Sequence, residues 1–220
     1  VVEGFISPDP ATYDLEGPYG ESTGYYGLAR KRPGVEVSCV TPRNDPIFRG
    51  AINESLTIMR LGASAVVWNM LEDQDIPGIL DVSVGPVTAI KIHKTYQGQA
   101  RQITAAIWGS RNSITTAKFI VVIDEENGVD IGDPAQLLGA MTRHMDPSNG
   151  IIVYPLQLGT PVDPAMSSEM QDEIEYGQGV SSKVLIDATV DWTTHPRREE
   201  WGGRRLSPSC FVPTPEVAET

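Results

Sequence analysis

The chain has 220 residues, of which 40% are hydrophobic, and a formal net charge of -12, so it is long enough to bury one substantial core. The negative charge argues against nucleic-acid binding, because phosphate backbones attract lysine and arginine. No apolar run approaches the roughly 20 residues of a membrane-spanning helix, and the two cysteines lack metal-site spacing. We therefore predict a globular cytoplasmic protein that binds neither nucleic acid nor membrane and has no metal site within this chain.

The first segment has strand patterns at residues 1–6 and 35–40, separated by a loop rich in glycine and proline. Two strands alone are marginally stable in water. Because the chain also lacks an initiating methionine, we expect these strands to join a sheet whose other strands lie outside this sequence.

The loop between the two strand patterns contains a pair of carboxylates. Glu16 and Glu21 flank Gly17-Pro18-Tyr19-Gly20, where proline fixes one backbone dihedral and the glycines permit close approach of a ligand. Two carboxylates held close together do not ionise independently, so one of them could keep a proton near neutrality and act in acid/base chemistry. The alternative is an ordinary surface turn with two solvated acidic side chains.

The remainder of the chain alternates helix and strand patterns, which indicates an α/β layer domain. A helix is predicted over residues 52–72, with Gly62 as a break or bend. A second helix is predicted to start at Pro134, with Asp133 as its N-cap. The other predicted elements are strands at 79–84, 87–94, 119–123, 151–154 and 184–188 and a helix at 97–108.

Several segments, in order along the chain, carry a resemblance to one known family. They are Val2-Glu3-Gly4, the run from Glu16 to Tyr26, Val40-Thr41-Pro42-Arg43-Asn44-Asp45-Pro46-Ile47, Gln97-Gly98-Gln99-Ala100, the run from Lys118 to Asp124, Val129-Asp130-Ile131, Arg143-His144-Met145-Asp146-Pro147 and the run from Lys183 to Thr189. Together these segments resemble the UbiD-type decarboxylases that depend on prenylated FMN. The resemblance extends from Val1 to Val190.

The resemblance implies a fold and a domain organisation. The expected fold is the end of a β-barrel-like cofactor domain followed by an α/β layer domain. Residues 1–50 would be the C-terminal part of the cofactor-binding β domain, 51–78 a helical linker, 79–190 the α/β C-terminal domain and 191–220 a tail.

The resemblance also implies reversible, non-oxidative decarboxylation of an aromatic or α,β-unsaturated carboxylic acid. The expected cofactors are prenylated FMN, Mn²⁺ and K⁺. The family's metal ligands, and the arginine that works with the two glutamates, lie upstream of the motif and are absent from this chain. The expected partners are therefore a small carboxylic acid, the N-terminal portion of the enzyme and further copies in a homo-oligomer.

By the same resemblance, Glu21 would be the proton donor and Glu16 its partner in an ionic network. Arg111 falls where the family places a basic residue near the cofactor phosphate, with surface placement as the alternative. Thr160 and Val162 fall where the family lines its substrate pocket, with plain packing as the alternative. A different class of function also stays open, namely a non-catalytic assembly or binding subunit with the same fold.

Overall fold

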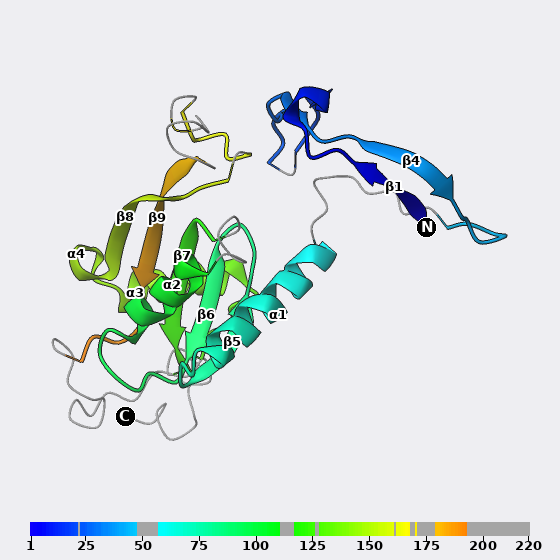
Figure 1. Ribbon diagram of the computed structural model, residues 1–220. Coiled ribbons are helices and arrows are strands. Elements are labelled where there is room, and N and C mark those ends of the chain that lie inside the picture. Colours follow the sequence, from blue (N-terminus) through cyan, green and yellow to red (C-terminus); the bar gives the residue numbers. More distant parts are fainter. Residues whose placement is uncertain are drawn as a thin grey trace, which may run out of the picture.

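The structure is a computed structural model that describes residues 1–21, 23–47, 57–110, 117–125, 128–160, 162–167, 170 and 179–192. Its elements are, in chain order, β1 (Val2–Ile6), η1 (Pro10–Thr12), β2 (Asp14–Glu16), β3 (Arg30–Arg32), β4 (Val35–Val40), α1 (Thr57–Asp73), β5 (Ile79–Ser83), β6 (Thr88–Ile92), α2 (Gln99–Gly109), β7 (Phe119–Asp124), α3 (Pro134–His144), α4 (Pro147–Gly150), β8 (Ile151–Leu158) and β9 (Val180–Asp187). Figure 1 shows the ribbon of β1 and β4 apart from the larger α/β layer, with α1 alongside that layer. No described helix has the length and apolar composition needed to span a membrane.

A five-stranded mixed sheet in the order β5-β6-β7-β9-β8 forms the centre of the α/β layer. Strands β6, β7 and β9 run parallel, whereas β5 and β8 pair antiparallel at the two edges. The central strand β7 is hydrophobic at successive positions because it is buried on both faces. Ile120 and Val122 contribute to one core, and Val121 and Ile123 contribute to the other. This confirms the predicted α/β class.

Helices α1 and α2 supply one core, and α3 supplies the other. Side chains of α1 and α2, such as Leu71 and Ile103, pack with Leu185 of β9, and Leu137 of α3 packs on the opposite face. The predicted N-cap of α3 is present, since the Asp133 side chain accepts hydrogen bonds from the backbone N–H groups of the first turn. The predicted break at Gly62 is wrong, because α1 runs through this residue.

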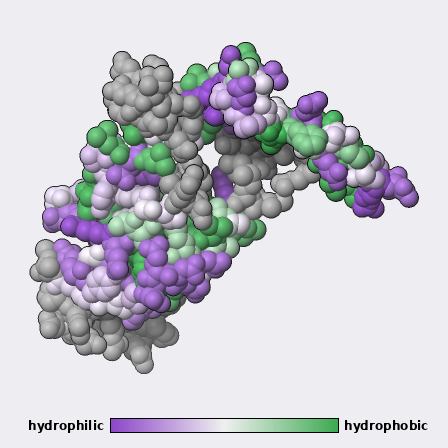
Figure 2. Space-filling view, in the orientation of Figure 1, coloured by the Kyte–Doolittle hydropathy of each residue, from purple (hydrophilic) through white to green (hydrophobic). Residues whose placement is uncertain are grey.

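The first segment contains two small antiparallel sheets, β1 with β4 and β2 with β3. Apolar side chains on the first sheet stay exposed, including Val2, Phe5, Val35 and Val37, and Figure 2 shows hydrophobic and hydrophilic residues interleaved over this ribbon. The described residues close no barrel, so a barrel-like architecture is not found within the described part of the chain. The β2–β3 hairpin was not predicted from the sequence.

Strands β8 and β9 are each longer than their predicted patterns. Their pairing extends to Leu158 opposite Val180, with an irregularity between Tyr154 and Gln157. The connection that follows β8 therefore begins at the end of the sheet that carries the N-termini of the parallel strands β6, β7 and β9. This connection contains Thr160 and Val162.

Candidate active site

The β2–β3 hairpin brings acidic and basic side chains onto facing strands. Asp14-Leu15-Glu16 pairs antiparallel with Arg30-Lys31-Arg32, so Glu16 lies opposite Arg30 and Asp14 lies opposite Arg32. Opposite charges across an antiparallel pair are mutually stabilising. Their complementarity helps to fix the register of these three-residue strands and therefore the position of Glu16.

A tight loop joins the two strands and positions the second carboxylate. The Gly27 N–H donates to Tyr19 O at 3.0 Å, and the Glu21 N–H donates to Tyr25 O at 2.9 Å. Gly17 begins the loop with a φ of 82°, a left-handed conformation that favours glycine. These backbone constraints return the chain toward β3 and place Glu21 in the wall of a cavity that Glu16 also lines.

Glu16 and Glu21 line the same cavity, which has a volume of about 160 Å³. Glu16 is exposed and Glu21 is partly buried. The remaining wall is formed by Gly17, Tyr19, Gly27, Leu28, Arg30, Arg32 and Val162. The cavity therefore combines two carboxylates, two guanidinium groups and a phenol with a small apolar surface.

Arg32 and Tyr19 are polar residues that line this cavity together with Glu16. The Arg32 Nε lies 3.9 Å from Glu16 Oε2. Hydrogen bonding toward Glu16, followed by partial desolvation and the charges of Glu16 and Glu21, raises the pKa of Tyr19, while Arg32 acts in the opposite direction. The Tyr19 phenol therefore remains protonated at neutral pH and can donate to a carboxylate.

Val162 and Thr160, the two residues predicted to line a substrate pocket, lie differently relative to this cavity. Val162 lies in the wall of the cavity, although more than 130 residues separate it from the glutamates in sequence. Thr160 is not among the residues that line this cavity. Its Oγ1 accepts from the Val162 N–H at 3.5 Å and its backbone oxygen accepts from Asp163, so Thr160 shapes the turn that carries Val162. Arg111 lies outside the described residues.

Tyr19, Arg30 and Arg32 are site residues that the sequence reasoning did not single out. Tyr19 lies inside the two-carboxylate motif, and its position between the glutamates was an available signal. The arginines had a weaker signal, namely the basic triplet Arg30-Lys31-Arg32 that follows Asp14 and Glu16 after a loop. Only the strand register shows that both arginines face the cavity.

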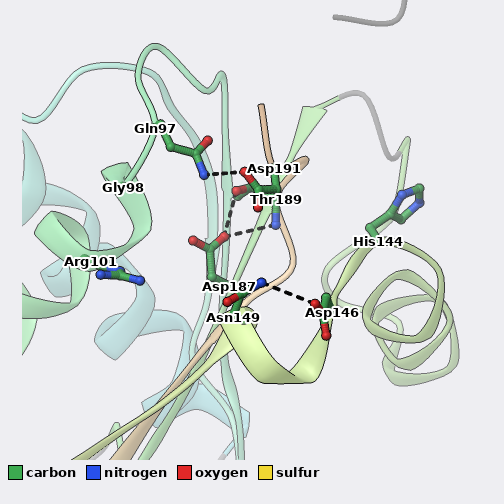
Figure 3. A pocket seen from close by; sticks show the side chains of 10 residues that line it. Gln97, Gly98, Arg101, His144, Asp146, Asn149, Asp187, Thr189 and Asp191 are labelled. Atoms are coloured by element: carbon green, nitrogen blue, oxygen red, sulfur yellow. Dashed lines mark hydrogen bonds between the residues drawn. The ribbon is translucent and has the colours of Figure 1, made fainter. Parts of the chain in front are cut away.

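Two larger cavities lie elsewhere in the described part of the chain. One, of about 430 Å³, lies beside the N-terminus of α2 and the carboxyl end of β9 (Figure 3). Carboxylates in this cavity accept hydrogen bonds from neighbouring side chains. The Gln97 amide donates to Asp191 at 2.9 Å, and the Thr189 hydroxyl donates to Asp187 at 2.7 Å. The other, of about 480 Å³, is a largely apolar groove between α1, the β5–β6 turn and α3. Neither cavity contains Glu16 or Glu21.

The described residues provide no cluster of three or more histidine, cysteine, aspartate or glutamate side chains that could hold a metal ion. The cavity contributes two carboxylates, and hard cations such as Mg²⁺ take several oxygen ligands. The donor set within the described part of the chain therefore does not form a complete metal site.

Two family profiles match adjacent parts of this sequence. The profile of the 3-octaprenyl-4-hydroxybenzoate carboxy-lyase Rift-related domain matches residues 1–55. The profile of the 3-octaprenyl-4-hydroxybenzoate carboxy-lyase C-terminal domain matches residues 56–188. The boundary between the two matches falls just before the start of α1.

Solved structures of UbiD-class enzymes are similar to the chain over nearly its full length. The UbiD-class enzyme HmfF from Pelotomaculum thermopropionicum, in complex with FMN, is 28% identical with a TM-score of 0.71, over 99% of this chain and 46% of that chain. An evolved dimeric form of HmfF in complex with prFMN is 25% identical with a TM-score of 0.66, over 99% of this chain and 44% of that chain. Vanillic acid decarboxylase from Sedimentibacter hydroxybenzoicus is 26% identical with a TM-score of 0.76, over 94% of this chain and 42% of that chain.

This chain thus spans less than half the length of each of these enzymes. The profile matches nevertheless extend from residue 1 to residue 188 and include both glutamates, Val162 and the whole α/β layer. The chain belongs to the UbiD family of carboxy-lyases.

Proposed function

We propose that the complete protein of which this chain forms part is a decarboxylase that uses prenylated FMN to remove CO₂ from an aromatic or α,β-unsaturated carboxylic acid, or to add it in the reverse direction. Family membership supports this proposal. The observation that carries it is the shared cavity of Glu16, Glu21 and Val162, because acid/base groups and an apolar surface are both needed to act on such a substrate.

Decarboxylation breaks the bond between a carbon atom and its carboxyl group and leaves the bonding electron pair on that carbon. Prenylated FMN, when bound, supplies the electron acceptor that no ordinary side chain provides. We assign the next step to Glu21, whose carboxyl group gives its proton to that carbon and is later reprotonated by solvent. Glu16 lies beside Arg32, with 3.9 Å between Arg32 Nε and Glu16 Oε2, and completes the ionic network.

The proposed substrate class fits the charges and surfaces of the cavity. Arg30 and Arg32 favour an anion, whereas Val162 offers an apolar contact to the unsaturated part of the acid. A volume of about 160 Å³ is below the roughly 300 Å³ at which small-molecule pockets begin. We therefore propose that these residues form one wall of the site and that the rest of the protein supplies the other walls.

The remaining assignments belong to the complete protein and follow from the family. We propose that residues 1–50 complete a barrel-like cofactor domain, that residues 51–78 link it to the α/β domain, and that Arg111 contacts the cofactor phosphate. Mn²⁺ and K⁺ would be held mainly by residues outside this chain. Homo-oligomerisation is proposed as well, supported by the evolved dimeric form of HmfF.

Replacement of Glu21 by glutamine in the complete protein tests the assigned proton donor. Glutamine keeps the shape of the side chain and removes its acid, so we expect CO₂ release to fall at least a hundredfold. The flavin absorbance and the cofactor mass should stay as in the wild type. Headspace measurement of CO₂, a visible spectrum and mass spectrometry of the purified protein provide these three readouts.

Glu36→Gln is the matched control, because Glu36 is an exposed β4 residue outside the cavity, and its turnover should be unchanged. Full turnover of the Glu21 variant would remove Glu21 from the mechanism. A wild-type protein without a modified flavin and without CO₂ release would instead favour the non-catalytic subunit.

A further inference from the structure

The turn that carries Val162 into the cavity wall is held by Asp163, the next residue. The Asp163 N–H donates to Thr160 O at 3.0 Å, and Asp163 Oδ1 accepts from the Ala165 N–H at 3.0 Å. The Met166 N–H donates to Asp163 O at 3.1 Å. The backbone of Asp163 and one of its carboxylate oxygens therefore define the shape of the turn around Val162.

The other carboxylate oxygen of Asp163 ties this turn to the sheet. Lys118, which directly precedes β7, donates from Nζ to Asp163 Oδ2 at 2.7 Å, and the Ser181 hydroxyl of β9 donates to the same oxygen at 3.5 Å. The backbone oxygen of Lys118 in turn accepts from the Val184 N–H of β9 at 2.9 Å. The turn is thus anchored to the end of the sheet where β7 and β9 begin.

The ion pair between Asp163 and Lys118 is partly shielded from solvent, since the Asp163 side chain is only 12% exposed and that of Lys118 is 38% exposed. Burial acts to raise the pKa of Asp163, but its hydrogen bonds, led by the one from Lys118, and the charge of Lys118 outweigh burial and lower that pKa. The Asp163 carboxylate is therefore charged at neutral pH. A charge-assisted hydrogen bond in such a place is screened less by salt than an exposed ion pair.

We infer that Asp163 and Lys118 are positioning residues that fix the Val162 wall of the cavity relative to the sheet and thereby govern how tightly the unsaturated acid binds. The inference rests on the proposed function and adds two residues that act through Val162, neither of which is among the described residues that line the cavity. Because Val162 contributes an apolar surface and no acid or base, its displacement should weaken the binding of substrate and leave proton transfer from Glu21 intact.

The first experiment follows the Val162 methyl signals by NMR in the complete protein labelled with ¹³C in the valine methyl groups. These signals are assigned by their loss in Val162→Ala. Lys118→Met and Asp163→Asn should both displace them, since methionine carries no donor and an amide supplies one acceptor oxygen where the carboxylate supplies two. Unchanged Val162 signals in either variant would overturn the inference.

Each variant has a matched control elsewhere in the α/β layer. Lys91→Met removes a lysine that donates at 2.9 Å to a backbone oxygen between β7 and α3, so it cuts a tether of the same kind at a different loop. Asp133→Asn makes the same change at a carboxylate that also accepts from a backbone N–H two residues on, that of Ala135, at 2.9 Å. Both controls should leave the Val162 signals in place. A displacement in either control as large as in Lys118→Met would indicate general loosening of the layer and contradict the inference.

The second experiment measures steady-state CO₂ release by the complete protein, with vanillate as an aromatic probe and cinnamate as an α,β-unsaturated one. For Lys118→Met and Asp163→Asn we expect KM to rise roughly fivefold, the effect of one displaced apolar contact, with kcat within about twofold of the wild type. The double variant should be no worse than either single variant, because each change alone breaks the ion pair. An unchanged KM, a fall in kcat alone, or additive effects in the double variant would contradict the positioning role.

The two experiments separate failure of this inference from failure of the proposed function. The NMR signals need neither substrate nor turnover, so they decide the anchoring of the Val162 turn even in a protein that releases no CO₂ from either probe. Displaced Val162 signals in such a protein would support the anchoring and count against the proposed function. Unmoved signals in an active enzyme would overturn the anchoring and leave the proposed function standing.

Discussion

At the scale of single residues, Gly27 determines where the Glu21 carboxylate can lie. A β-carbon at position 27 would lie 2.9 Å from Glu21 Oε1 and 3.2 Å from Glu21 Cγ, closer than such contacts normally are. These atoms belong to the outer part of a flexible side chain, so the backbone can tolerate the added group. The absence of a side chain at Gly27 therefore leaves room for the carboxylate at the cavity wall.

Gly27→Ala should consequently fold normally and displace Glu21. We expect kcat for CO₂ release by the complete protein to fall at least tenfold, because a shift of about 1 Å in a reacting group costs substantial rate. The far-UV circular dichroism spectrum and the cofactor absorbance should stay unchanged. Gly62→Ala makes the same chemical change at an open helix position, and turnover should be unaffected there. Wild-type turnover of Gly27→Ala would contradict this role.

At the scale of elements, the patterns along the α/β layer predicted the helices and strands well where the periodicity was long. Strands of five or six residues with a buried face, such as β6 and β7, have a readable hydrophobic pattern. The three-residue strands β2 and β3 are too short for a period to be recognised, and their register depends on cross-strand charges. The helix α1 was predicted with a wrong break, because glycine lowers helix propensity without preventing helix formation.

The continuity of α1 makes Gly62 a site of stabilisation. Gly62 lies within the exposed part of the helix, and no atom lies within 4 Å of the position that its β-carbon would occupy. Gly62→Ala should therefore raise the free energy of unfolding by about 0.5–1 kcal/mol. Urea unfolding of the complete protein measures this change. The reverse substitution at the exposed neighbour Ala65→Gly should lower the urea midpoint, and a lower midpoint in Gly62→Ala would contradict the helical assignment.

At the scale of the whole molecule, the described hydrophobic cores belong to the α/β layer, and the described strands of residues 1–40 bury no hydrophobic residue. The β9 strand also buries a charge, because Lys183 is only 3% exposed. Desolvation lowers the pKa of Lys183 to about 8, below its ordinary value of 10.5. The stability of the layer should therefore depend on pH in the alkaline range.

The sign of this dependence follows from proton binding. Between pH 8 and 10.5 the unfolded chain retains a proton on Lys183 that the folded chain has lost, so stability rises with pH across this window. Urea midpoints of the complete protein measured from pH 7.5 to 10 should increase. Lys183→Met should reduce the rise, with Lys94 supplying a residual effect of the same sign, whereas the exposed Lys31→Met should keep it. An equal rise in wild type and Lys183→Met would exclude Lys183 as its source.

The sequence by itself determined the α/β class, most element positions and the two carboxylates on a constrained loop, because each of these depends on local periodicity or on residues a few positions apart. The tertiary structure decided which side chains share the cavity. It places Val162 beside Glu16 across more than 130 residues, puts Arg32 opposite the acidic strand and leaves Thr160 in the supporting turn. Such contacts depend on how distant elements pack and on strand register, and neither leaves a periodic signal along the chain.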